Sequence, residues 1–180
     1  MQTLNTERLT LRAWRGDDAE DYLALAGDLE VSDFSGCTRP ENAAAAREFI
    51  NEYLIPKECL AITLHGDGRA TGNIALLDTV YSRAFSSLNA REAAFSLIPS
   101  KWGRGIMSEA LTALLEHGFS SLGLDFVCCG CFVGNLRCER LLSSFGFAPC
   151  FETQSVFVRS DGSRPIERLH LLTENRFHNR

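Results

Sequence analysis

The chain has 180 residues, of which 45% are hydrophobic and 23% are charged, and its formal net charge is -5. This length and composition are typical of one globular domain with a sizeable core, so we expect a single domain over residues 1–180. The negative charge argues against a general nucleic-acid-binding protein. It is compatible with a cationic substrate such as an amine, although a charge of this size also simply keeps a protein soluble.

The cysteines are seven in number and irregularly spaced. Near the start of the chain, Glu7 and Arg8 stand where a secretory signal would be apolar, and no apolar run is long enough to span a membrane. We therefore expect a cytoplasmic protein with reduced thiols. Cys128 and Cys131 form a C-x-x-C pattern, but no second pair of ligands follows at zinc-like spacing. Core packing is therefore predicted, and no metal site.

The first half of the chain is predicted to contain a strand, two helices and a two-stranded hairpin. In chain order, the strand spans 6–12, the first helix 19–26, a loop 28–40 and the second helix 38–53. The two strands of the hairpin span 59–64 and 71–77. The first strand is indicated by period-two alternation, which places Leu9 and Leu11 on one face. The hairpin is indicated by the turn Gly66-Asp67-Gly68.

The second half is predicted to alternate strands and helices and to end in a hairpin. After a loop over 79–89, the ranges are a strand at 91–97, a helix at 106–119, a strand at 124–133, a helix at 135–145, a short strand at 147–151, and a hairpin of 155–159 with 166–172. The strand at 124–133 is almost wholly apolar, which suits a strand covered on both faces. This order predicts a mixed α/β, or α+β, sheet with helices on both faces.

The turn between the strand at 91–97 and the helix at 106–119 has the composition of an anion site. Gly103 and Gly105 bracket Arg104 directly before the predicted helix. The first turn of a helix has unpaired N–H groups and a positive dipole end, and glycines allow a phosphate to approach the backbone. We interpret the turn as a diphosphate cradle. It is neither a Walker A loop nor a dinucleotide fingerprint, because no Gly-Lys-Ser/Thr follows and the third glycine would fall on Ser108.

The run Trp102-Gly103-Arg104-Gly105-Ile106-Met107 resembles the acetyl-CoA loop of the GNAT acetyltransferase superfamily, Gln/Arg-x-x-Gly-x-Gly/Ala. Trp-Gly-Arg-Gly followed by Glu-Ala is similar to the RimJ/RimL-type subgroup, and so is the opening Thr6-Glu7-Arg8-Leu9-Thr10-Leu11-Arg12. Met107 departs from the family's glycine or alanine. The resemblance covers nearly the whole chain. It implies a GNAT-like fold with a central twisted β-sheet flanked by helices on both faces. It also implies CoA bound by residues 102–108, with its diphosphate on residues 103–108, Ser108 included.

A second run, from Asn135 to Phe147, resembles the family's Asn-x-x-Ser-x-Arg-x-Leu-x-x-x-Gly-Phe, with Arg140 and Gly146 at family spacing. In the family this asparagine contacts the cofactor arm, which makes Asn135 a candidate cofactor-binding residue. Asparagine is also a leading helix N-cap residue, and the two roles are compatible.

Transfer of an acetyl group to an amine needs a base, because amines are protonated at neutral pH. Glu92 is the candidate base. On the predicted strand, Glu92, Ala94 and Ser96 share a face of small residues that leaves room for a substrate. The position matches a glutamate common in RimJ/RimL-type proteins. The alternative is a solvent-facing glutamate paired with Arg91 or another cation.

The resemblance implies two further roles. A backbone N–H near Ser96 or Leu97 would hold the oxyanion, and Cys138 would help to protonate the leaving CoA thiolate, since it stands where the RimL-type pattern has serine. The alternative for Cys138 is a small hydrophobe on the apolar side of its helix, with solvent as the proton source.

We interpret the sequence as a GNAT N-acetyltransferase that moves the acetyl group of acetyl-CoA directly to a primary amine. By resemblance, the acceptor is a protein N-terminal amine, as in ribosomal proteins, or a small amine. No nucleic acid, membrane or metal partner is expected; homodimers are common in the family, although no residue pattern here indicates one. The alternative is a non-catalytic acyl-CoA-binding sensor on the same fold, which Met107 and the lack of a tyrosine after Tyr81 keep open.

Overall fold

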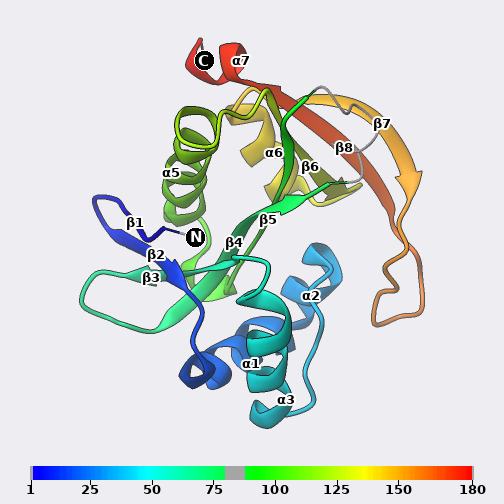
Figure 1. Ribbon diagram of the computed structural model, residues 1–180. Helices are drawn as coiled ribbons and strands as arrows, with labels where there is room; N and C mark the ends of the chain where they lie inside the picture. Colours follow the sequence, from blue (N-terminus) through cyan, green and yellow to red (C-terminus); the bar gives the residue numbers. More distant parts are fainter. Residues whose placement is uncertain (1, 80–87, 180) are drawn as a thin grey trace. The chain divides into compact units, whose positions relative to one another are not determined.

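The computed structural model describes residues 2–79 and 88–179 (Figure 1). Its contacts group into two compact units, residues 1–75 with 95–114 and residues 76–94 with 115–180. Strand β4 (Ala70–Asp78), strand β5 (Ala90–Leu97) and helix α5 (Ile106–Ser120) run from one unit into the other. All three were predicted within two residues of their bounds. The predicted loop over 79–89 lies largely outside the described residues.

The first unit contains antiparallel strands β1 (Leu4–Asn5), β2 (Leu9–Ala13), β3 (Leu60–Leu64) and the start of β4. In β2, Leu9 and Leu11 are fully buried, and Leu11 pairs with the equally buried Ile62 of β3. The alternation along the first strand thus positions its apolar face as predicted, and the hairpin of β3 and β4 is confirmed.

Helical segments of the first unit lie between β2 and β3. They are a 3₁₀ turn (Gly16–Asp18), α1 (Ala19–Gly27), α2 (Leu29–Ser35), α3 (Ala43–Phe49) and a π-helical turn (Ile50–Leu54). The loop predicted over 28–40 is wrong, because α2 forms inside it. The Asp28 side chain caps this helix by accepting from Val31 N, and Gly36 ends it with φ of 66°. The second long helix starts later than predicted, at the Asn42 cap.

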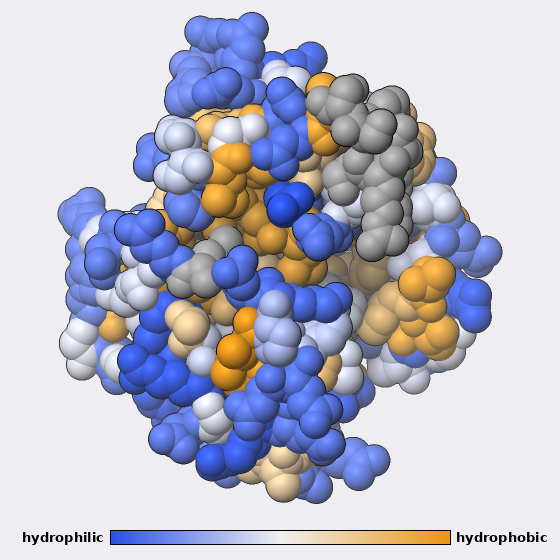
Figure 2. All heavy atoms as spheres, in the orientation of Figure 1, coloured by the Kyte–Doolittle hydropathy of each residue, from blue (hydrophilic) through white to orange (hydrophobic). Residues whose placement is uncertain are grey.

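These helices bury their apolar sides. Tyr22, Leu25 and Ile50 are at most 2% exposed. Tyr22 stacks on Phe49, and Phe49 stacks on Tyr53. The outer sides of these helices are polar, and Figure 2 shows that the surface over α1 and α3 is mostly hydrophilic.

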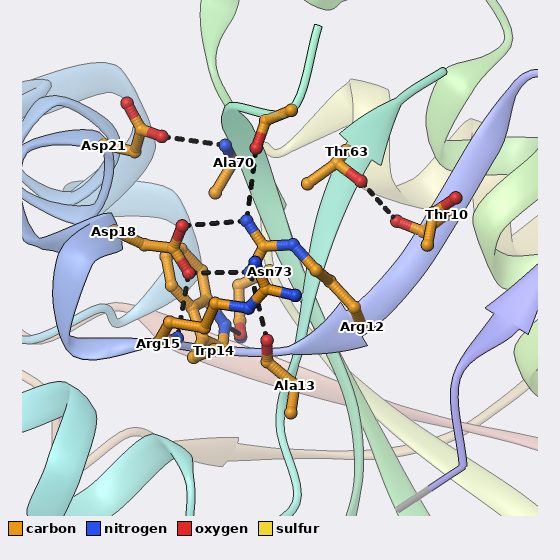
Figure 3. Close-up of polar contacts among 11 residues, drawn as sticks. Thr10, Arg12, Ala13, Trp14, Arg15, Asp18, Asp21, Thr63, Ala70 and Asn73 are labelled. Carbon is orange, nitrogen blue, oxygen red and sulfur yellow. Dashed lines mark hydrogen bonds and ion pairs between the residues drawn. The ribbon is translucent and has the colours of Figure 1, made fainter. Parts of the chain in front are cut away.

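A polar network joins β2 to the start of α1 (Figure 3). Arg12 contacts Asp18 through two hydrogen bonds of 2.7 and 2.8 Å, and the two side chains are 11% and 10% exposed. The Arg12 guanidinium also donates to the carbonyls of Ala13 and Gly68. The two charges thus balance each other, and both Arg12 Nη atoms and both Asp18 carboxylate oxygens are hydrogen-bonded, as a buried ion pair requires.

The second unit is a sheet with β5 parallel to β6 (Phe126–Phe132), β6 antiparallel to β8 (Ile166–Thr173), and β8 antiparallel to β7 (Ala148–Gln154). The predicted final hairpin is wrong in its first strand, because β8 pairs with β7 and residues 155–159 form no strand. Ser155 N bonds to Pro165 O and closes the connection directly after β7. Val156 beyond it is 91% exposed, so the apolar residues there do not report a buried strand face.

Helix α6 (Leu136–Ser144) follows β6, and a short α7 (Glu174–His178), which was not predicted, follows β8. Asn135 caps α6, and Gly146 lies beyond its end with φ of 83°. The predicted helix over 135–145 is therefore confirmed. Among the described residues, we find no helix with the length and apolar character needed to cross a membrane.

Candidate functional site

The predicted cradle is an exposed turn in the first unit. Gly103 and Gly105 have φ of 70° and 72°, in the left-handed region that favours glycine. Nothing lies within 4 Å of an ideal Cβ on Gly103. Both glycines and Arg104 are exposed, so the backbone of the turn is open to a ligand.

The turn is held at both ends. On the strand side, Trp102 Nε1 donates to Leu97 O at 2.7 Å, which brings these two predicted site residues together. On the helix side, Ile106 is 3% exposed and anchors α5 in the core. Gly105 O accepts from Glu109 N, so the helical hydrogen bonds start at Gly105 and the N–H groups before Glu109 have no acceptor within the helix. Residues 105–108 are therefore the donors that an anion can use.

The departure at Met107 does not bury the turn. Met107 and Ser108 are half-buried in the first turn of α5, next to the exposed Gly105. The N–H of Met107 lies in the first turn of the helix and has no acceptor within the helix, and this does not depend on its side chain.

Sequence reasoning did not single out the N-terminal residues that hold the first turn of α5. The Glu109 carboxylate accepts from Thr6 Oγ1 at 2.5 Å, Arg8 N at 2.8 Å and Arg8 Nε at 2.6 Å. Partial burial acts to raise the pKa of Glu109, but these hydrogen bonds and the Arg8 charge outweigh it and lower the pKa. The signal was present, because Thr6, Arg8 and Glu109 all lie in the two runs that resemble RimJ/RimL-type proteins.

Glu92 lies on β5 in the second unit, half-buried and registered with Cys128 of β6. Burial raises the pKa of Glu92, and the charge of Glu167 raises it further. Arg91, the partner considered in the alternative, instead lies 3.4 Å from Asp78. Glu92 therefore has the environment of a carboxylate whose proton affinity is increased, as a general base for an amine requires.

Glu167 was not predicted. It lies on β8 on the same sheet face as Gly130 of β6, because Gly130 registers with Leu169, two residues further on. The register of Glu92 with Cys128 places Glu92 on this face as well. The signal that could have found Glu167 is Gly130, a glycine inside an otherwise apolar strand, since such a position often marks a close approach.

Asn135 and Cys138 are brought together at the start of α6. The Asn135 side chain accepts from Cys138 N at 3.2 Å, so it acts as an N-cap. The neighbouring Cys129 thiol and burial raise the pKa of Cys138, although the neighbouring Cys131 thiol acts in the opposite direction. The Cys138 thiol therefore stays protonated at neutral pH.

Cys128, Cys129 and Cys131 are buried, as core packing predicts. Cys129 and Cys131 face one side of β6, while Cys128 faces the other and contacts Thr79 Oγ1 at 3.7 Å. All seven cysteines are free. Within residues 2–79 and 88–179, no group of three or more His, Cys, Asp or Glu side chains is arranged to hold a metal ion.

Glu92 and Cys138 do not share a face of the second unit's sheet. Glu92 lies on the side of Cys128, and Cys138 contacts the cysteines of the opposite side. In the second unit, the sheet therefore separates the two predicted catalytic side chains.

The family model that matches the chain is an acetyltransferase (GNAT) domain, over residues 8–148. The chain therefore belongs to the GNAT acetyltransferases and is an acyltransferase enzyme, in a family whose domains use acetyl-CoA as co-substrate. It is 30% identical over 146 residues to the uncharacterized N-acetyltransferase YoaA of Bacillus subtilis (strain 168), which covers 80% of this chain and 81% of the relative.

Two solved structures are similar in fold. An acetyltransferase (GNAT family) from Bacillus anthracis has a TM-score of 0.81 at 18% identity, covering 97% of this chain and 99% of the other. Ribosomal-protein-S5-alanine acetyltransferase from Vibrio fischeri has a TM-score of 0.72 at 13% identity, covering 97% and 98%. These likenesses confirm the predicted fold class, a mixed α/β fold with a large twisted sheet flanked by helices.

Proposed function

We propose that this acetyltransferase moves the acetyl group of acetyl-CoA directly to a primary amine, with the CoA diphosphate on residues 103–108. The observation that carries the proposal is the exposed turn at the start of α5, in which two glycines with left-handed φ leave the first-turn N–H groups open. Arg104 adds a positive charge at this turn, and acetyl-CoA is the anionic co-substrate that the family uses.

Glu92 is the proposed base. The acceptor amine must lose a proton before it attacks the thioester carbonyl, and a carboxylate with a raised pKa accepts that proton better than an ordinary one. The oxyanion that forms is assigned to a backbone N–H near Ser96 or Leu97, on the strand whose Leu97 carbonyl accepts from Trp102.

Cys138 is the proposed acid. When the tetrahedral intermediate collapses, the thiolate of CoA needs a proton, and the Cys138 thiol is protonated at neutral pH. The base serves the amine nitrogen and the acid serves the sulfur. Both atoms are bonded to the same carbon of the intermediate, so the proposal requires the thioester to lie where side chains from both faces of the sheet reach it. Asn135, which fixes the first turn of α6, is assigned to the cofactor arm.

For the acceptor, we infer a RimJ/RimL-like activity on a protein N-terminal amine, with a small amine as the second candidate. A fold neighbour is named a ribosomal-protein-S5-alanine acetyltransferase, which supports the first candidate. We further infer one functional domain over residues 1–180 that acts in the cytoplasm. A homodimer stays a prediction.

The test is an acceptor screen with acetyl-CoA labelled in the acetyl group, read by mass spectrometry. The panel holds a peptide with a free N-terminus, the same peptide blocked at its N-terminus but carrying a lysine, and spermidine. We expect turnover with the free N-terminus. Glu92→Gln should lower kcat by at least ~100-fold, the scale of a general base, and the exposed Glu116→Gln serves as control. Acetyl-CoA binding without turnover on any acceptor would favour the sensor instead.

A further inference from the structure

Arg8 connects the N-terminal segment to the glycine turn through two contacts. Its Nε donates to Glu109 Oε2 at 2.6 Å, and its Nη1 donates to Arg104 O at 3.1 Å. The third nitrogen, Nη2, lies 3.4 Å from the place of an ideal Cβ on Gly105. The guanidinium therefore spans the first turn of α5 and the backbone of the turn before it.

The contact with Arg104 O fixes a peptide plane. In a trans peptide the C=O and the following N–H point in opposite directions. Because Arg8 holds the carbonyl of Arg104 on its own side, the N–H of Gly105 faces the other side. Gly105 has φ of 72°, so no Cβ hinders this orientation. The result is a donor that is oriented before any anion arrives.

The contact with Arg8 neutralises a negative charge, that of Glu109, beside the proposed diphosphate site. A carboxylate in the first turn of a helix interacts well with the helix dipole, but here it stands beside the turn that is assigned to a diphosphate. Without a partner it would repel the phosphates. Arg8 is 48% exposed and Glu109 is 18% exposed, so the positive partner is the one more open to solvent.

We propose that Arg8 is a positioning residue for CoA, which orients the Gly105 N–H through the Arg104 carbonyl and cancels the charge of Glu109 beside the diphosphate. The inference rests on the proposed function, since it concerns the same turn. It assigns to the N-terminal segment, far from the turn in sequence, a part in cofactor affinity rather than in fold stability alone.

The test is calorimetric titration of acetyl-CoA into the wild type, Arg8→Gln, Glu109→Gln and the double variant, at low and high salt. Arg8→Gln should weaken binding about tenfold, because it removes a charged hydrogen bond and leaves Glu109 unpaired. Adding Glu109→Gln to Arg8→Gln should recover acetyl-CoA affinity about threefold, since the repulsion between the Glu109 carboxylate and the phosphates is removed. The deficit of Arg8→Gln should shrink at high salt. The control is Arg47→Gln, an exposed arginine paired with Asp17, which should bind like the wild type.

A purely structural Arg8 gives a different pattern. Arg8→Gln would then lower the melting temperature without changing the Kd, and the second substitution would recover nothing; either result overturns the proposal. Should Arg8→Gln fail to fold, Arg8→Lys is the second variant, because it keeps the charge but lacks the several N–H donors of the guanidinium. Wild-type affinity in Arg8→Lys would contradict the role of the hydrogen bond to the Arg104 carbonyl. No binding by the wild type would remove the proposed function and this inference together, whereas unchanged binding by Arg8→Gln removes this inference alone.

Discussion

The Glu167 carboxylate occupies the space that a side chain on Gly130 would need. An ideal Cβ on Gly130 would lie 1.8 Å from Glu167 Oε1 and 2.8 Å from its Cδ. The carboxylate thus rests on the backbone of β6, on the face that also carries Glu92. Gly130 is required for this placement, and the placement brings a like charge near the proposed base.

Gly130→Ala should change the chemistry more than the stability. The new Cβ meets the end of a flexible side chain, so Glu167 can rotate away at a cost of about 1 kcal/mol or less. Glu92 then loses a neighbouring negative charge, and its pKa falls toward its ordinary value. We expect the acid limb of the pH–rate profile to move to lower pH, and Glu167→Gln should move it in the same direction. An unmoved profile in both variants would show that Glu167 does not act on Glu92.

Glu92→Gln should make the protein more stable at neutral pH while it lowers turnover. The pKa of Glu92 is raised in the folded state, so the folded protein binds this proton more tightly than the unfolded chain does. Stability therefore falls as pH rises from the unfolded pKa through the folded one, and the deficit persists above it. Glutamine carries no such penalty.

The measurement is urea denaturation from pH 4 to pH 8, with Glu116→Gln as the matched control on an exposed carboxylate. The gain in Glu92→Gln should grow with pH and then level off. A Glu92→Gln protein that becomes less stable than the wild type as pH rises would indicate that the Glu92 carboxylate has a stabilising partner.

The predicted elements that proved correct carry a strong hydrophobic pattern. The alternation around Leu9 and Leu11 and the apolar run from Phe126 to Phe132 report burial directly. Helix α2 was missed because its seven residues carry no helical period. It depends on its caps, Asp28 and Gly36, which act locally and look like loop residues.

The candidate site was predictable where its residues are consecutive. The turn from Trp102 to Ser108 reads as one motif, and Asn135 with Cys138 as another. Arg8 and Glu109 are 101 positions apart, and the contact between them is visible only in the folded chain. The same holds for Glu167, whose effect on Glu92 follows from the register of β8 on β6.

Arg12→Met should destabilise the protein by about 3–5 kcal/mol, because it leaves Asp18 buried without its partner. The two side chains are 11% and 10% exposed, and the network around them is shown in Figure 3. Arg47→Met removes an exposed pair, 55% and 94% exposed, and should cost less than about 1 kcal/mol. Midpoints of urea unfolding measure both. Equal losses would mean that burial of the Arg12 pair does not control its contribution.

Gly72→Ala should destabilise the first unit by about 1–3 kcal/mol or more. Its Cβ would lie 2.5 Å from the backbone oxygen of Ser96, which cannot rotate away as a side chain can. Gly27→Ala is the control, since nothing lies within 4 Å of its Cβ at the end of α1, and alanine is favoured in a helix. Gly27→Ala should raise the melting temperature slightly. Unchanged stability in Gly72→Ala would contradict the close approach of Ser96 O to Gly72.

The central claim is that the turn before α5 binds acetyl-CoA, and calorimetric titration of acetyl-CoA into the wild type, Gly105→Asp and Gly123→Asp tests it most directly. Both glycines have positive φ, 72° and 61°, so the two variants share the backbone strain and the added charge. We predict tight binding to the wild type and Gly123→Asp, and loss of binding in Gly105→Asp, whose carboxylate would face the diphosphate. Absence of binding to the wild type, or equal binding to both variants, would contradict the claim.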